Sequence, residues 1–154
     1  MHRSSVIVIL LSLLLAASAQ AGTGSIVKVL PLFLDKKEQY TLSPSLFERD
    51  AYQAELRMKP GLRSGMVYRV EWKAKGKVLA PLKIRLELRG VTKGNLPRQL
   101  VIEQPVEKRG WFTQWASVPL KGEDYKNFGE VVAWRATLWE GDDLLLGSEQ
   151  SFLW

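Results

Sequence analysis

The chain has 154 residues, a formal net charge of +6, no cysteine and a single histidine, His2. The lack of cysteine excludes a disulfide scaffold. Residues 22–154 contain neither histidine nor cysteine, which excludes Ser-His-Asp and Cys-His catalysis. The usual ligands of zinc, copper and haem are missing as well. The composition therefore predicts a protein that is not an enzyme and holds no metal or other cofactor.

Residues 1–21 have the layout of a secretory signal peptide. A basic start precedes a ten-residue apolar run, 6–15, and small residues follow it. That run is shorter than the stretch of about 20 residues that spans a bilayer. We therefore expect cleavage after Ala21 or Ala19, a secreted or periplasmic product, and no stable membrane span after cleavage.

Residues 22–154 are long enough for a single domain with a core of its own. Neither Asn95 nor Asn127 lies in a glycosylation sequon. An exported protein without cysteine or a sequon fits a bacterial cell envelope better than an animal extracellular space.

The first two predicted elements are the least regular. The run 26–34 contains Pro31, which indicates an edge strand or a kink because proline cannot donate to a ladder. The run 51–58 alternates like a strand, but apolar residues also recur at helical spacing through residues 45–58. Both interpretations of that segment stay open.

The later elements alternate more clearly. Residues 82–89 are apolar at every even position and polar or charged at odd positions until the turn, as a half-buried antiparallel strand requires. Residues 122–129 read as a crossing loop with one helical turn. In chain order, the predicted strands are 26–34, 51–58, 66–74, 82–89, 99–105, 111–119, 130–139 and 144–153.

Many short strands separated by turn signals predict an all-β fold, an antiparallel β-sandwich of about 7–8 strands with an immunoglobulin-like order. Trp72 on the third predicted strand and Tyr125 before the seventh carry a resemblance to immunoglobulin-like and fibronectin type III-like sandwiches. The immunoglobulin cysteine pair is missing. The chain also resembles uncharacterised secreted bacterial proteins, a resemblance that implies no activity.

Basic residues suggest one candidate binding surface. If the third and fourth predicted strands pair as a hairpin, Arg69, Arg85 and Arg89 form one positive face with neighbouring lysines. Such a face could meet a polysaccharide, whereas we expect no nucleic-acid partner for an exported protein. The other interpretation is a solvated face on which Glu71 and Glu87 neutralise the cations.

Aromatic residues suggest a second surface. Trp111 and Trp115 share one face of the run 111–119, and Phe112 lies on the other. If Phe112 faces the core, the two tryptophans form an exposed platform for sugar rings or a protein. If the strand is central, they are packed instead.

The last 25 residues are predicted to form a closing β-hairpin with its turn at Glu140–Asp143 and Trp134 in the core. The acidic residues of that turn do not have the spacing of a calcium loop. A terminal aromatic at Trp154 resembles the C-terminal signal of outer-membrane β-barrel proteins, although the predicted strands are short for a membrane.

The sequence thus predicts an exported, non-catalytic binding or structural module of the bacterial cell envelope, with a protein or polysaccharide partner. One alternative is a carbohydrate-binding module that uses exposed tryptophans. Another is a small outer-membrane β-barrel.

Overall fold

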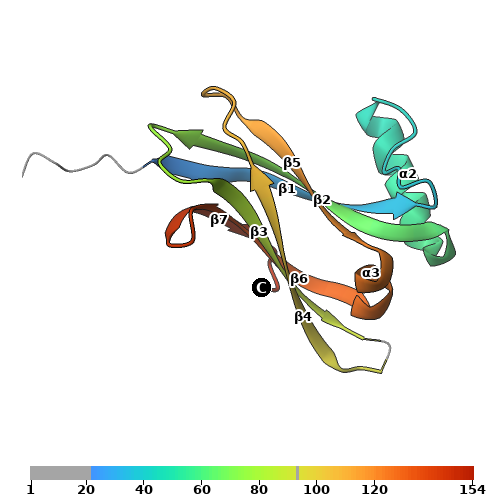
Figure 1. Ribbon diagram of the computed structural model, residues 1–154. Coiled ribbons are helices and arrows are strands. Elements are labelled where there is room, and N and C mark those ends of the chain that lie inside the picture. Colours follow the sequence, from blue (N-terminus) through green and yellow to red (C-terminus); the bar gives the residue numbers. More distant parts are fainter. Residues whose placement is uncertain (1–21, 93) are drawn as a thin grey trace, which may run out of the picture.

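The chain folds into two antiparallel β-sheets that pack face to face (Figure 1). The computed structural model describes residues 22–92 and 94–154, so the predicted signal peptide lies outside the described residues. Seven strands run through this described part, and the predicted antiparallel β-sandwich is confirmed. Each sheet ends in two edge strands and does not close on itself.

The strands divide between the sheets out of sequence order. The three-stranded sheet has the order β1-β2-β5, with β1 at Thr23–Asp35, β2 at Arg63–Lys75 and β5 at Gln114–Lys121. The four-stranded sheet has the order β4-β3-β6-β7, with β3 at Leu82–Val91, β4 at Pro97–Val106, β6 at Glu130–Glu140 and β7 at Leu144–Gln150. Strands β2 and β3 therefore lie in different sheets.

Alternate residues of both sheets meet in a shared core. The even-numbered residues of β3 point inward, as their alternation predicts, and Trp72 lies beneath them on β2 with 1% of its surface exposed. Burial of each large apolar side chain contributes roughly 1.5–3 kcal/mol. The largest fully buried side chains are Trp72, Tyr68, Phe128, Leu56, Ile84, Leu86, Leu88, Leu120, Leu138, Val70 and Val118.

The predicted strand 51–58 is wrong, and the helical interpretation of residues 45–58 is confirmed. Helix α2 spans Leu46–Met58, and the hydroxyl oxygen of Ser45 caps it by accepting the backbone N–H of Glu48 at 3.4 Å. A short 3₁₀ turn, η1 (Pro60–Leu62), follows it, and helix α3 (Gly122–Phe128) stands where the crossing loop was expected. Trp72 consequently lies on the second strand rather than the third.

Helix α2 covers one end of the edge strand β1 (Figure 1). The buried carboxamide of Gln53 accepts the N–H of Phe33 at 2.7 Å and donates to the carbonyls of Phe33 and Tyr40, each at 2.9 Å. The side chain thus occupies the place of a neighbouring strand at this point. Pro31 lies on the same edge, as its sequence position indicated.

Strand β7 covers the other end of β1. A Cβ atom added to Gly147 would lie 2.7 Å from the Cα of Ser25, so only glycine allows the two backbones to approach this closely. This side of the sandwich is therefore closed by α2 at one end of β1 and by β7 at the other.

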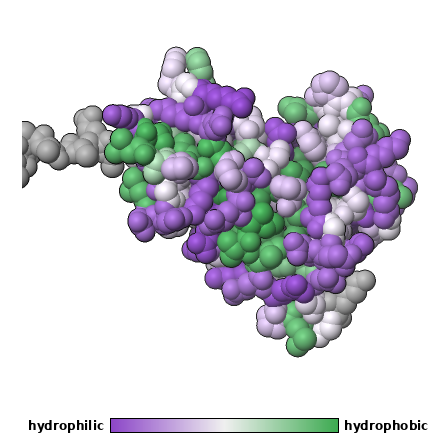
Figure 2. Space-filling view, in the orientation of Figure 1, coloured by the Kyte–Doolittle hydropathy of each residue, from purple (hydrophilic) through white to green (hydrophobic). Residues whose placement is uncertain are grey.

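The opposite side is open. Here the edge strands are β4 and β5, and in the described residues no further strand pairs with either of them. The inward side chains of β4, Leu100, Ile102 and Val106, are only half-buried although they pack against the core. Both strands face the viewer in Figure 1, and Figure 2 shows hydrophobic residues in the middle of that face between hydrophilic ones.

Candidate binding site

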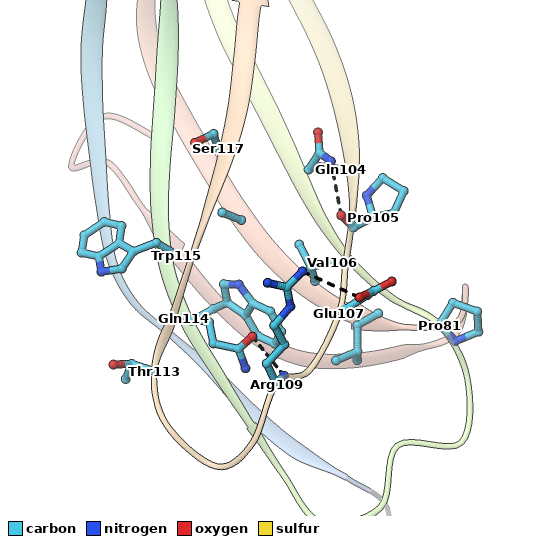
Figure 3. Close-up of a pocket in the computed structure, with 13 residues that line it drawn as sticks. Pro81, Gln104, Pro105, Val106, Glu107, Arg109, Thr113, Gln114, Trp115 and Ser117 are labelled. Carbon is cyan, nitrogen blue, oxygen red and sulfur yellow. Dashed lines mark hydrogen bonds and ion pairs between the residues drawn. The ribbon is translucent and has the colours of Figure 1, made fainter.

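A groove of about 850 Å³ lies between the edge strands β4 and β5 (Figure 3). Its floor is apolar, because Trp72 and Leu82 of the core and Ala116 of β5 line it. Gln104 and Val106 contribute from the β4 side. One end of the open side thus holds a groove with an apolar floor and a polar rim, bounded by two strand edges.

The loop between β4 and β5 limits the groove at one end. The backbone N–H of Arg109 donates to the carboxamide oxygen of Gln114 at 3.1 Å, and the Arg109 guanidinium lies 3.9 Å from the Glu107 carboxylate. Figure 3 shows the Arg109 side chain between the two strands, with Trp115 on the far side of β5. Arg109 and Glu107 are both largely exposed, so a ligand can displace their weak pair at little cost.

The prolines of the edge strands show which backbone groups face the open side. Along a strand, residues direct their N–H and C=O alternately to the two sides. Proline lacks the N–H and is tolerated where that group would point away from the ladder. Pro97 and Pro105 on β4 and Pro119 on β5 therefore indicate that odd-numbered residues of both strands turn their backbone groups to the open side.

Hydrogen bonds elsewhere in the sheets support this assignment. Ser151 donates to the Trp134 carbonyl at 2.9 Å, so even-numbered residues of β6 face β7 and odd-numbered ones face β3. The register from β6 through β3 then places the odd-numbered residues of β4 at its free edge. In the other sheet, Phe33 faces Gln53, and the register through β2 leads to the odd-numbered residues of β5.

Five residues thus present both an N–H and a C=O to the open side. Gln99, Val101 and Glu103 do so on β4, between its two prolines, and Trp115 and Ser117 do so on β5 before Pro119. Alternation alone could not reveal these groups, because their exposure depends on which strands stand at the edges.

Two of the residues expected to bind a ligand, Trp115 and Arg69, lie together on the outer face of the three-stranded sheet. The Arg69 guanidinium carbon lies 5.5 Å from the centre of the Trp115 ring and 5.7 Å from that of Tyr40. An N–H of the same guanidinium group, at Nη1, also donates to the Tyr40 hydroxyl at 3.2 Å. Trp115 keeps 44% of its surface exposed, so part of this side chain remains accessible beside the groove.

The expected strand-face platform of Trp111 and Trp115 is not formed as predicted. Strand β5 begins at Gln114, and Trp111 lies in the preceding loop. The premise was that Phe112 faces the core, but Phe112 is 61% exposed and stacks on Trp111 with ring centres 4.3 Å apart. Glycine at 110 in a left-handed conformation (φ +81°) turns the chain there, which ends the alternation on which the prediction rested.

The expected single basic face does not form either, because the hairpin it required is absent. Arg69 lies on β2, whereas Arg85 and Arg89 lie on β3 in the other sheet. The connection between these strands crosses from sheet to sheet, and the buried carboxylate of Glu140 accepts the N–H groups of Leu79 and Ala80 there.

Arg85 and Arg89 instead belong to a mixed cluster on the outer face of the four-stranded sheet. Glu87 accepts from Arg135 at 2.6 Å and lies 3.6 Å from Arg85. The guanidinium carbons of Arg89 and Arg135 lie 4.0 and 4.7 Å from the centre of the Trp154 ring. Neighbouring groups therefore neutralise or cover most of these cations.

Acidic side chains do not gather into a cation site in residues 22–92 and 94–154, where no cluster of three or more potential metal ligands occurs. At the β6–β7 turn, Asp142 pairs with Lys83 at 2.6 Å, and the same lysine contacts Glu103 at 3.2 Å.

The described helices are all too short or too polar to cross a bilayer. Comparison of the chain with protein-family models, curated proteins and solved structures finds no match.

Proposed function

We propose that the protein is an exported, non-catalytic binding module of the bacterial cell envelope, and that it binds an extended peptide segment of another protein along its open side. One observation carries the proposal: β4 and β5 present unpaired backbone groups along the open side of the sandwich, which holds a groove near the β4–β5 loop, while the fold covers the corresponding edge of β1.

The chemistry of the open side favours a polypeptide. An extended peptide offers N–H and C=O groups at the spacing of a strand edge and places alternate side chains on a surface. The half-buried Leu100 and Ile102 of β4 supply such a surface. Natural proteins normally blunt or cover free edges, as Gln53 does for β1 here.

Peptides selected on the wild-type protein from a random twelve-residue library provide the test. Ala116 lines the groove, so Ala116→Trp should fill it and weaken binding of the selected pool at least tenfold. Ala54→Trp, on the exposed side of α2, is the matched control and should leave binding unchanged. Failure to select any peptide, or equal binding by both variants, would refute the proposal.

Export is a separate part of the proposal and has its own test. The layout of residues 1–21 supports it. Expression of the full chain in a bacterium should yield a periplasmic product whose N-terminal sequence begins at Gly22 or Gln20. An uncleaved cytoplasmic product would contradict it.

The exposed stack of Trp111 on Phe112 favours a second candidate function, carbohydrate binding. Retention on a polysaccharide array should then be lost on Trp111→Ala and kept in Phe152→Ala, which removes a fully exposed aromatic elsewhere. Equal retention of both variants and the wild type would remove this candidate.

We further propose that the sandwich is immunoglobulin-like. Its order of strands supports the likeness in part, since the sixth strand lies between the third and seventh. Two features depart from the constant-type arrangement. The fourth strand lies beside the third, and the core tryptophan, Trp72, lies on the second strand.

A further inference from the structure

We propose that the bound segment adds to β4 as a further strand of the four-stranded sheet, paired with Gln99, Val101 and Glu103. This inference rests on the proposed function, because it specifies the edge that a peptide on the open side would use. It also specifies the chemical class of the peptide.

The supply of backbone groups favours β4 over β5. Three successive odd-numbered residues of β4 carry both a donor and an acceptor at the free edge, between Pro97 and Pro105. On β5 only Trp115 and Ser117 do so before Pro119 removes a donor. A peptide on β4 can thus form three complete pairs of hydrogen bonds, against two on β5.

Side chains next to these groups favour the same edge. The inward residues between the three positions are Leu100 and Ile102, and both are half-buried. An added strand would place its own inward side chains against them, beside the groove that β4 lines from Gln104 onward. The corresponding inward residue of β5 is Ala116, which offers less apolar surface.

The outer face of β4 adds a preference at single positions. Val101 is 47% exposed, so an apolar or β-branched side chain directly opposite it would bury both. The Glu103 carboxylate is about two-fifths exposed and already contacts Lys83, so a basic side chain opposite it is accepted and an acidic one is repelled. The expected ligand is therefore an extended segment of at least five residues with apolar residues at alternate positions.

The same geometry restricts proline in the ligand. Peptide residues opposite Gln99, Val101 and Glu103 must donate an N–H to β4, so proline is excluded at these alternate positions and tolerated between them. Proline should therefore be absent from every second position of the selected peptides.

Proline substitution in the protein tests the edge directly. Val101→Pro removes the central donor at a position where the N–H points away from the ladder, as at Pro97 and Pro105. We expect it to weaken binding of the selected peptides at least tenfold, while Val101→Thr, which keeps the donor, retains binding. Ser117→Pro removes a donor of the opposite edge strand, β5, and should weaken binding less than Val101→Pro does.

Two further readouts keep the test decisive if Val101→Pro does not fold. A selected peptide can be N-methylated either at its odd-numbered or at its even-numbered residues. One of these two forms should lose binding and the other should keep it, because only alternate N–H groups of the peptide face β4. Bound peptide should also slow hydrogen exchange at the amides of Gln99, Val101 and Glu103.

The outcomes separate the two proposals. Loss of binding in Ser117→Pro but not in Val101→Pro, or protection of amides on β5 alone, would overturn the addition to β4 and leave the groove as the binding site. Equal binding in both proline variants together with loss in Ala116→Trp would do the same. Absence of any selected peptide would overturn both.

Discussion

Gln53 pairs through its carboxamide with both backbone polar groups of Phe33, at 2.7 and 2.9 Å, and so acts as a one-residue substitute for a missing strand. Removal of the carboxamide would leave these groups and the carbonyl of Tyr40 without a partner. We expect Gln53→Ala to lower the free energy of unfolding by about 2–3 kcal/mol. Urea unfolding measures this loss, and Gln99→Ala, at an exposed glutamine, should cost little. A loss no larger than in that control would contradict the role of Gln53.

The contact between Tyr52 and Asp35 should make the attachment of α2 depend on pH. The hydroxyl of Tyr52 donates to the Asp35 carboxylate at 2.6 Å. This hydrogen bond, with burial and the nearby negative charges, raises the pKa of Tyr52 to about 12. Burial alone would raise the pKa of Asp35, but the hydrogen bonds from Tyr52, Gln39 and Lys37 outweigh it and hold that pKa below its ordinary 3.8.

The signs of these shifts define two pH ranges. A raised tyrosine pKa stabilises the fold fully below the ordinary value of 10.0, and the contribution disappears as pH rises toward 12. A lowered carboxyl pKa stabilises the fold above 3.8, and this contribution disappears as pH falls further. Stability measured against pH should therefore fall more steeply above pH 10 in the wild type than in Tyr52→Phe. Parallel curves would show that the contact does not form.

Glu140 and Asp142 are neighbouring acids with opposite roles. Glu140 is buried and accepts N–H groups of the β2–β3 connection, whereas Asp142 is exposed and pairs with Lys83. We expect Glu140→Ala to cost about 2–3 kcal/mol of unfolding free energy, because two amide donors lose their acceptor. Asp142→Asn should change thermal stability little, since exposed ion pairs contribute little. Similar melting temperatures for the two variants would refute this assignment.

Trp154 should hold the C-terminal turn on the outer face of the four-stranded sheet. Its ring lies under the guanidinium groups of Arg89 and Arg135. Each such contact is worth about 0.5–1 kcal/mol at an exposed site. We expect Trp154→Ala to lower the unfolding free energy by about 1–2 kcal/mol by urea titration. Phe152→Ala, two residues away and fully exposed, is the control and should have no effect.

Local pattern was enough to predict the sandwich and most of its strands. The strand 82–89 was predicted from strict alternation, and the structure extends it by two residues to Val91. Helix α2 was ambiguous because its solvent side carries Phe47, Ala51 and Met58 while its inner side carries the polar Gln53. The spacing of Ser45 and Glu48, a capping signal, was present in the sequence and would have favoured the helix.

The candidate site was harder to predict because it depends on pairings between distant segments. Whether Arg69 and Arg85 share a surface is decided by a connection that crosses between sheets, and residues near it give no local signal of the crossing. Strands β4 and β5 have free edges only because of how the other strands pair with one another. The sequence shows where the prolines are, but it does not show that the backbone groups between them are unpaired.

The pair of prolines on β4 also limits what the edge can join. At the free edge of β4 only three backbone donors stand between Pro97 and Pro105, so a ladder built there ends after a few residues. The two prolines therefore discourage edge-to-edge association between copies of the protein, although each copy retains a window wide enough for one short segment.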